Sequence, residues 1–248
     1  PYTTAYVMIG LTAARDAGYQ VDSRVLNEGL HNLKSQLNRF RAALRAESPD
    51  RAPFADPTDR IYMLYALSLH GQADPGHVND IFQDRREMSP YGNALLALTL
   101  YEMGDRERAG RVVAELERDS KYFKGLRHWE VDESKYRWQD SSVEATAWVL
   151  RALVRRNPND PGLEEVVRWL AMKRNGGYWY STKDTAMTVI ALAEYVSARS
   201  DLADPSYSAD VYLNGRRVRT IQVGREDVFG SEVVIPLEGA RVGKNTVT

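Results

Sequence analysis

An apolar helical unit that ends in Ala-Leu recurs along the chain, and it constrains the fold more than any other feature. Its clearest copies are residues 141–153, SSVEATAWVLRAL, and residues 181–192, STKDTAMTVIAL. A long apolar run behind a helix-start signal is typical of a buried helix. The terminal pair, or its Gly-Leu equivalent, recurs at Gly10-Leu11, Ala66-Leu67, Ala97-Leu98, Ala152-Leu153 and Ala191-Leu192. The chain is therefore predicted to use one helical unit repeatedly.

The two clearest copies begin with residues that cap helices. Ser141 precedes Glu144 by three positions, which is the spacing of a capping box, and Ser181 with Asp184 is a weaker version of it. Asp140, Glu144 and Asp184 are also candidates for acid–base chemistry. A helix N-terminus favours an anion, so capping explains all three positions, and we interpret these carboxylates as structural.

Similar helix-start and helix-stop signals along the chain predict nine helices in antiparallel hairpins, so the predicted fold class is mainly α. The odd-numbered helices are the more apolar and the even-numbered ones the more amphipathic, as expected if inner helices are ringed by outer ones. Hairpins that cannot bury their faces alone must stack, and their uneven spacing favours a closed α/α toroid over an open solenoid. The predicted starts after the first helix are Asp22, Asp56-Pro57, Asp74-Pro75, Ser89-Pro90, Asp105, Ser141, Asp160-Pro161 and Ser181.

A second domain is predicted from about residue 206, after a helical domain over residues 1–203. Residues 208–223 alternate apolar and polar side chains on both sides of Asn214-Gly215, a pair typical of a type I′ hairpin turn. Residues 233–235 form another candidate strand, and residues 243–248 begin a further one. We expect an antiparallel β domain that is incomplete in this sequence.

Composition excludes several classes of function. The formal net charge is −1, which gives no electrostatic basis for a nucleic-acid partner. There is no cysteine, so disulfides and cysteine-based zinc sites are excluded within this sequence. The four histidines (His31, His70, His77, His128) lack metal-ligand spacing, and we expect neither a metal nor a cofactor. No apolar run approaches the roughly 20 residues that span a bilayer, so we expect a soluble chain.

Aromatic residues and glycines mark two loops. Trp129 and Trp138 are candidates for ligand binding, but we favour aromatic side chains that pack a loop against the helices. Gly176 and Gly177 precede an aromatic run, and this GG-aromatic turn is common in helical toroids, terpene cyclases and prenyltransferases among them. We interpret the glycines as structural, because they permit positive φ between paired helices. The Asp-rich or Cys/His zinc motif that those enzymes need is absent from the sequence.

A resemblance to a known family covers nearly all of residues 1–200. The segments YGNALLALTLYEMGD, HWE, SSVEATAWVLRALV, VVRWLAMKRNGGYW and STKDTAMTVIALAEYV occur in that order. This series resembles the thioester domain of the alpha-2-macroglobulin and complement family. The β segment falls where that family resumes its CUB domain, and the lack of cysteine is more similar to bacterial members than to animal ones.

The resemblance implies a toroid of twelve helices, of which about nine are in this sequence. It also implies that the family's Cys-x-Glu-Gln thioester motif lies before Pro1, so no catalytic or thioester residue is assigned here. Some members use a loop histidine for acyl transfer, and the corresponding loop, residues 47–59, has none. The structural motif residues are Trp138, Asp140, Ser141, Glu144, Gly176, Gly177, Ser181 and Asp184.

The resemblance further implies a non-enzymatic role as part of a broad-range endopeptidase inhibitor that traps proteases after bait cleavage. The expected partners are proteases and other domains of the parent chain, and the expected location is periplasmic or extracellular. Because the sequence opens at Pro1 without a signal peptide, we expect an excised or processed piece; any lipid anchor would precede it. Two alternatives stay open: a toroid enzyme of the terpene-cyclase or prenyltransferase type, and a non-catalytic helical-repeat scaffold.

Overall fold

The chain forms two compact units, Pro1–Leu192 and Ala193–Thr248. The computed structural model describes residues 2–45, 57–131, 141–199, 206–224 and 240–248. Within these ranges the chain contains nine α-helices, one short 3-10 helix and four β-strands. No helix among the described residues is long and apolar enough to cross a membrane.

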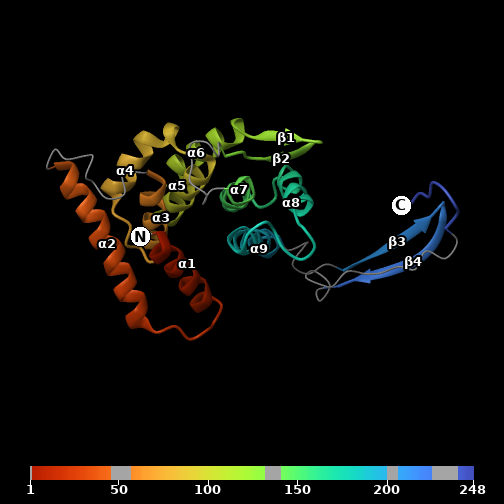
Figure 1. The fold of residues 1–248 in the computed structure, drawn as a ribbon, viewed down its shortest axis with the longest axis horizontal. Coiled ribbons are helices and arrows are strands. Elements are labelled where there is room, and N and C mark those ends of the chain that lie inside the picture. The colour runs from red at the N-terminus through yellow and green to blue at the C-terminus, as the bar shows by residue number, and fades with distance from the viewer. Residues whose placement is uncertain (1, 46–56, 132–140, 200–205, 225–239) are drawn as a thin grey trace. The chain divides into compact units, whose positions relative to one another are not determined.

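The helices of the first unit alternate between an inner and an outer position. α1 packs on α3, α3 on α5 and α5 on α7, while α2, α4, α6 and α8 pack on the outside of these helices (Figure 1). The predicted alternation of inner and outer helices is therefore confirmed. The helices are α1 (Tyr2–Asp16), α2 (Ser23–Arg45), α3 (Pro57–Ser68), α4 (Pro75–Asp84), the 3-10 helix η2 (Arg85–Glu87), α5 (Pro90–Glu102), α6 (Arg106–Arg118), α7 (Ser142–Arg156), α8 (Leu163–Met172) and α9 (Thr182–Ser197).

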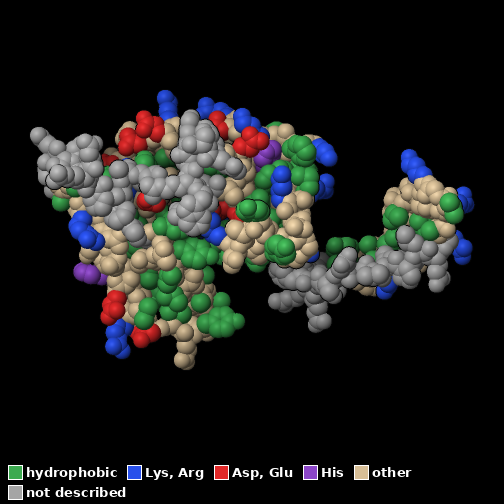
Figure 2. All heavy atoms as spheres, in the orientation of Figure 1, with side chains coloured by type: hydrophobic (Ala, Val, Ile, Leu, Met, Phe, Trp, Pro, Cys, Tyr) green, Lys and Arg blue, Asp and Glu red, His purple; other side chains and the backbone are tan. Residues whose placement is uncertain are grey.

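The difference between inner and outer helices follows from their sequences. α5 is apolar on every side and is buried continuously from Ala94 to Leu100. α6 buries one stripe at helical spacing, Ala109, Val112, Val113 and Leu116, and its other residues are half-buried or exposed. The exposed faces carry i,i+4 ion pairs such as Glu107–Arg111 at 2.8 Å. Figure 2 shows acidic and basic side chains interspersed on the surface of the helical unit.

Most predicted helix starts and stops agree with the structure. Asp74, Ser89 and Asp105 each accept a hydrogen bond from the backbone N–H three residues ahead, at 2.9, 3.2 and 3.0 Å. Gly104, at φ +81°, ends α5 in the left-handed conformation that a glycine tolerates. The start at Asp56 and the loop over residues 47–56 lie outside the described residues.

One predicted helix start is wrong. We expected α8 to begin directly after Asp160-Pro161, but its first helical residue is Leu163 and its N-cap is Gly162. Asp160 lies in the preceding turn, where its Oδ1 accepts the Gly162 N–H at 2.9 Å and its Oδ2 accepts from Arg156 at 3.3 Å. The Asp160 carboxylate therefore accepts hydrogen bonds within the turn and does not cap α8.

A short hairpin that the sequence did not lead us to expect follows α6. Strand β1 (Lys121–Phe123) pairs antiparallel with β2 (Leu126–His128). The turn residues Lys124 and Gly125 have φ of +52° and +76°, the positive values that a two-residue hairpin turn requires. β2 packs against α8, where the His128 ring stacks on Trp169 with centroids 4.6 Å apart.

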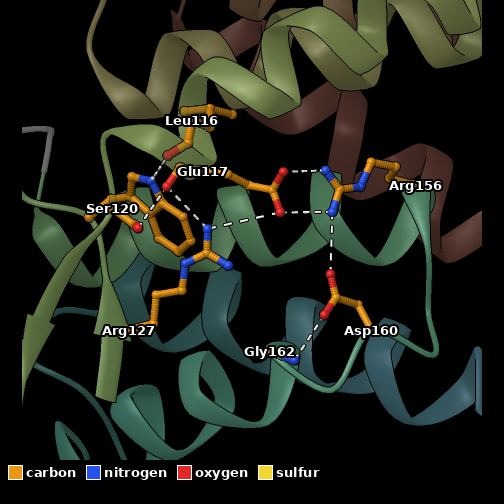
Figure 3. A network of polar contacts seen from close by, with 8 residues as sticks. Leu116, Glu117, Ser120, Arg127, Arg156, Asp160 and Gly162 are labelled. Carbon is orange, nitrogen blue, oxygen red and sulfur yellow. Dashed lines mark hydrogen bonds and ion pairs between the residues drawn. The ribbon is translucent and has the colours of Figure 1, made fainter. Parts of the chain in front are cut away.

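Polar contacts attach this hairpin to the ends of α6 and α7 (Figure 3). Arg127 Nη2 donates to the Glu117 carbonyl at 3.3 Å, and Glu117 Oε1 in turn accepts from Arg156 Nη2 at 2.7 Å. Trp129 is fully buried and donates from Nε1 to the Leu116 carbonyl at 2.6 Å. The prediction that Trp129 packs its loop against the helices is confirmed.

The second unit contains the predicted hairpin. β3 (Tyr207–Leu213) pairs antiparallel with β4 (Arg216–Val223) across Asn214-Gly215, whose φ angles are +53° and +80°. The last residues also join this sheet, because Tyr212 and Thr248 exchange backbone hydrogen bonds at 2.8 and 3.0 Å. The expected strand at residues 233–235 lies outside the described residues. The domain boundary between residues 203 and 206, and the assignment to a CUB domain, stay predictions.

Candidate functional site

Polar residues gather where the inner helices begin. We call this group the inner-end cluster. It contains residues from the caps or the first two turns of α1, α3, α5, α7 and α9. Its members are Tyr2, Tyr62, Tyr91, Ser141, Glu144, Ser181, Lys183 and Asp184.

Serine hydroxyls cap α7 and α9 and join the two helices. Ser141 Oγ accepts the Glu144 N–H at 3.0 Å, and Ser181 Oγ accepts the Asp184 N–H at 3.0 Å. The Asp184 carboxylate accepts two further hydrogen bonds, one from Ser181 Oγ at 2.9 Å and one from Ser141 Oγ. The carboxylate of one helix thus binds the capping hydroxyls of both, which links positions 43 residues apart in the chain.

A buried ion pair lies beside these caps. The Glu144 side chain is 0% exposed, and its Oε2 lies 2.6 Å from Lys183 Nζ, whose side chain is 21% exposed. Lys183 Nζ also lies 5.7 Å from the centroid of the Tyr2 ring, so one ammonium contacts residues of α1 and α7. A carboxylate this deeply buried needs a cationic partner, since removing it from water without one is strongly unfavourable.

Tyrosines cover the inner side of the ion pair. The rings of Tyr2 and Tyr62 stack with centroids 4.7 Å apart, and Tyr62 lies 6.1 Å from both Tyr91 and Trp148. Burial raises the pKa of Tyr62 and Tyr91 well above the usual value, and in both the nearby Glu144 charge raises it further. Both phenols are therefore neutral near pH 7.

The structure brings together four of the residues predicted as structural motif, namely Ser141, Glu144, Ser181 and Asp184. The glycine pair lies apart from them, in the turn between α8 and α9, where the Asn175 N–H donates to the Tyr178 carbonyl at 2.8 Å. Gly176 has the expected positive φ, +63°, but Gly177 does not, so only one of the two glycines is required by backbone geometry. Trp138 and Asp140 lie outside the described residues.

Sequence reasoning missed Lys183 and the three tyrosines. Lys183 stands between two capping residues, Ser181 and Asp184, and a cation there is unexpected beside the positive end of a helix dipole. A lysine at this unfavourable position was the sequence signal that could have indicated an acidic partner for it. The tyrosines carry no comparable signal, because an aromatic residue on an apolar helix is most often part of a core.

The arrangement is suited to holding helices together more than to performing chemistry by itself. Every charged member has a hydrogen-bonded or ionic partner within the cluster, and the serine hydroxyls are committed to caps. Across the described residues no group of three or more histidine, aspartate or glutamate side chains could hold a metal ion.

Comparisons with known proteins give this arrangement a context. The family model of the A-macroglobulin TED domain, the thioester domain, matches residues 77–195. Complement C3 of Lethenteron camtschaticum is 39% identical over 75 residues, which is 29% of this chain and 4% of that protein. The span that matches the TED model includes α5 to α8 and α9 up to Tyr195, and therefore the serine caps and the buried ion pair.

Solved structures of bacterial alpha-2-macroglobulins share the fold. Native E. coli alpha-2-macroglobulin has a TM-score of 0.63 at 20% identity, over 90% of this chain and 13% of that chain. The E. coli protein activated by porcine elastase gives 0.58 at 19% identity, over 92% and 20%. Salmonella alpha-2-macroglobulin reacted with methylamine gives 0.61 at 19% identity, over 90% and 14%.

These comparisons confirm the predicted fold class, an α/α toroid, and do not favour a terpene-cyclase or prenyltransferase. The chain spans a small part of every protein that it matches here, so the activity of a whole relative does not transfer to it directly. The A-macroglobulin TED model matches residues 77–195, and the fold is shared with bacterial alpha-2-macroglobulins, so the helical unit of this chain is similar to a thioester domain of the alpha-2-macroglobulin and complement type.

Proposed function

We propose that this chain forms the helical shell of the thioester domain in an alpha-2-macroglobulin-like inhibitor of endopeptidases. The observation that carries the proposal is the match of residues 77–195 to the A-macroglobulin TED domain. The fold shared with bacterial alpha-2-macroglobulins over 90% of the chain supports it.

The states in which the relatives were solved suggest how such an inhibitor works. The E. coli protein was solved after activation by porcine elastase, and the Salmonella protein after reaction with methylamine. For the protein that carries this chain, we propose that a protease cuts a bait segment and that a change of shape exposes a thioester. A lysine amine of the protease attacks the acyl carbon, the C–S bond breaks, sulfur leaves as thiolate, and the nitrogen loses a proton to solvent.

This chain contains no cysteine, so the reacting thiol would belong to another part of the protein. The contribution of this chain is then to hold and shield. A buried acyl group survives because water is excluded from it until cleavage. The inner-end cluster supports this role, because its caps and buried ion pair fix α7 and α9 relative to each other.

The partners and the location follow from the same proposal. Proteases are the expected external partners, and the other domains of the longer protein the internal ones. The β3–β4 unit is the proposed start of a CUB-like domain. Because the proteases to be inhibited act outside the cytoplasm, we infer a periplasmic or extracellular location at the cell envelope.

The proposal is tested with the full-length protein that carries this chain. Methylamine should release one thiol per molecule, measured with a thiol-reactive chromophore, and trypsin should form a covalent conjugate that survives denaturing electrophoresis. Protein inactivated beforehand with methylamine is the matched control, and it should form no conjugate.

Two negative results have different meanings. Absence of thiol release would remove the covalent step and leave only non-covalent trapping. If bait cleavage occurs and the protease still digests large substrates at its full rate, the inhibitor function itself is refuted.

A further inference from the structure

A hollow lined by arginines lies at the opposite end of the inner helices, where α5 and α7 finish. Its volume is about 270 Å³, and it is lined by Tyr101, Arg106, Gly110, Arg155 and Arg156. Tyr101 belongs to the last turn of α5, Arg106 and Gly110 to α6, and the two adjacent arginines to the last turn of α7. Figure 3 shows Arg156 with two of its carboxylate partners, Glu117 and Asp160.

Two of the three arginines already bind carboxylates on the rim. Arg155 Nη2 lies 3.0 Å from Glu102 Oε1, and Arg156 Nη2 lies 2.7 Å from Glu117 Oε1. Arg106 is different, because none of the carboxylates in the described part of the chain forms an ion pair with it. Arg156 Nη2 also lies 3.3 Å from Asp160 Oδ2, so Arg106 is the one arginine of the hollow that has no ion pair with a described carboxylate.

One phenol, that of Tyr101, lines the hollow together with the three arginines. Burial raises the pKa of Tyr101, while Arg156, Arg106 and Arg155 all act to lower it. These are the same three arginines that line the hollow together with Tyr101. A phenol O–H beside guanidinium N–H groups is a set of donors for an anion.

Gly110 keeps one wall of the hollow open. It stands in the interior of α6, where glycine is less favourable than alanine. A Cβ built on it would have no atom within 4 Å, so the backbone does not require a glycine there, and any side chain would project into open space. The residue is unfavourable for the helix but leaves room beside Arg106 and Tyr101.

We propose that this hollow binds an acidic side chain from a protein segment, with Arg106 as its main cation and the Tyr101 hydroxyl as a second donor. The planar guanidinium fork matches a carboxylate, and the neighbouring arginines already bind Glu102 and Glu117 in this way. The volume is slightly below the usual range of small-molecule pockets and suits one or two side chains.

The test measures binding of a short peptide of alternating glutamate and aspartate by isothermal titration calorimetry. The sample is the full-length protein, and the matched peptide of glutamine and asparagine is the control ligand. Arg106→Gln should weaken binding of the acidic peptide about tenfold or more. Gly110→Leu should weaken it similarly by filling the hollow. Raising the salt from about 50 to about 300 mM should also weaken binding.

A matched control separates this site from general surface charge. Arg168 is an exposed arginine on α8 with an i,i+4 partner, and Arg168→Gln should leave binding unchanged. Circular dichroism should show all three variants folded, since each replaced position is exposed or opens into empty space.

Three results would overturn the proposal. The first is no detectable binding of the acidic peptide by the unmodified protein. The second is binding of the acidic peptide by Arg106→Gln and by Gly110→Leu as tight as by the unmodified protein, which would place the peptide elsewhere. The third is binding of inorganic phosphate as tight as that of the peptide, which would make the ligand a small oxyanion and not a protein segment.

Discussion

The two ends of the inner helices both contain ion pairs between neighbouring helices, but the pair at one end is buried and the pair at the other is exposed to solvent. Where α7 begins, Glu144 is 0% exposed and pairs with Lys183 under a cover of tyrosines. Where α7 finishes, the side chains of Arg155 and Glu102 are 55% and 29% exposed and pair in contact with solvent. Both are ion pairs between neighbouring elements, at 2.6 and 3.0 Å.

This difference shows that the distance between two charges does not by itself determine how much an ion pair contributes to stability. An exposed pair contributes little, because water solvates each charge nearly as well as the partner does. A buried pair is costly to assemble, and breaking it leaves a charge without solvent. The first end is therefore suited to fixing helices in place, whereas the exposed ion pair at the second end contributes little to stability.

The largest effect is expected from breaking the buried pair. Lys183→Met should lower the free energy of unfolding by about 3 kcal/mol, because the Glu144 carboxylate would stay buried without its cation. Arg155→Met, at the other end, should cost only about 0.5 kcal/mol. Urea unfolding followed by circular dichroism measures both.

A double variant sharpens this result. Lys183→Met combined with Glu144→Leu removes both charges, and it should recover most of the lost stability, since an apolar pair can replace a buried ionic one. A double variant no more stable than Lys183→Met alone would contradict the electrostatic explanation and indicate a packing defect.

A smaller effect is expected at the cap. Ser141→Ala removes the acceptor of the Glu144 N–H and the donor to Asp184, and it should cost about 1–2 kcal/mol in thermal unfolding. Ser141→Thr keeps the hydroxyl and should restore most of this stability. If both variants lose the same amount, the hydroxyl does not carry the effect.

The smallest effect is a dependence on pH at the other end, where Asp105 caps α6. The backbone N–H of Arg108 is the largest of the influences that hold the pKa of this carboxyl below its usual value. The stabilisation is therefore fully present above pH about 4 and is lost as the pH falls through the lowered pKa.

The variant Asp105→Asn isolates this titration, because asparagine caps a helix about as well as aspartate. It should differ from the unmodified protein by about 0.5 kcal/mol near neutral pH and converge with it in acid. Unfolding free energies between pH about 2.5 and 6 give the measurement. An offset that stays constant across this range would argue against it.

Much of the fold could be read from local sequence signals. Ser141 and Asp105 predict helix starts because their side-chain oxygens can accept backbone N–H groups at an N-cap. The run of apolar residues in α5 predicts a helix surrounded on all sides. Asn214-Gly215 predicts its hairpin because both residues tolerate positive φ. Each of these signals acts within a few residues of the structure that it specifies.

The missed features depend on less distinctive local signals. Lys124-Gly125 forms a hairpin turn although lysine is an uncommon residue at positive φ, so the β1–β2 hairpin went unpredicted. Asp160-Pro161 has the local form of a helix start, but Asp160 is bound by Arg156 and by the turn itself. For Asp160, the contact with Arg156 at the end of α7 accompanies the failure of the sequence signal to start a helix at that point.

The sequence by itself determined the helical units, their caps, the β hairpin and the resemblance to a thioester domain, because those depend on residue order over short spans. Only the tertiary structure decided that Glu144 pairs with Lys183, that Asp184 binds the caps of two helices, and that three arginines share one hollow. The physical reason is that the energy of a charge depends on its burial and its neighbours, and both are set by packing between segments far apart in the chain.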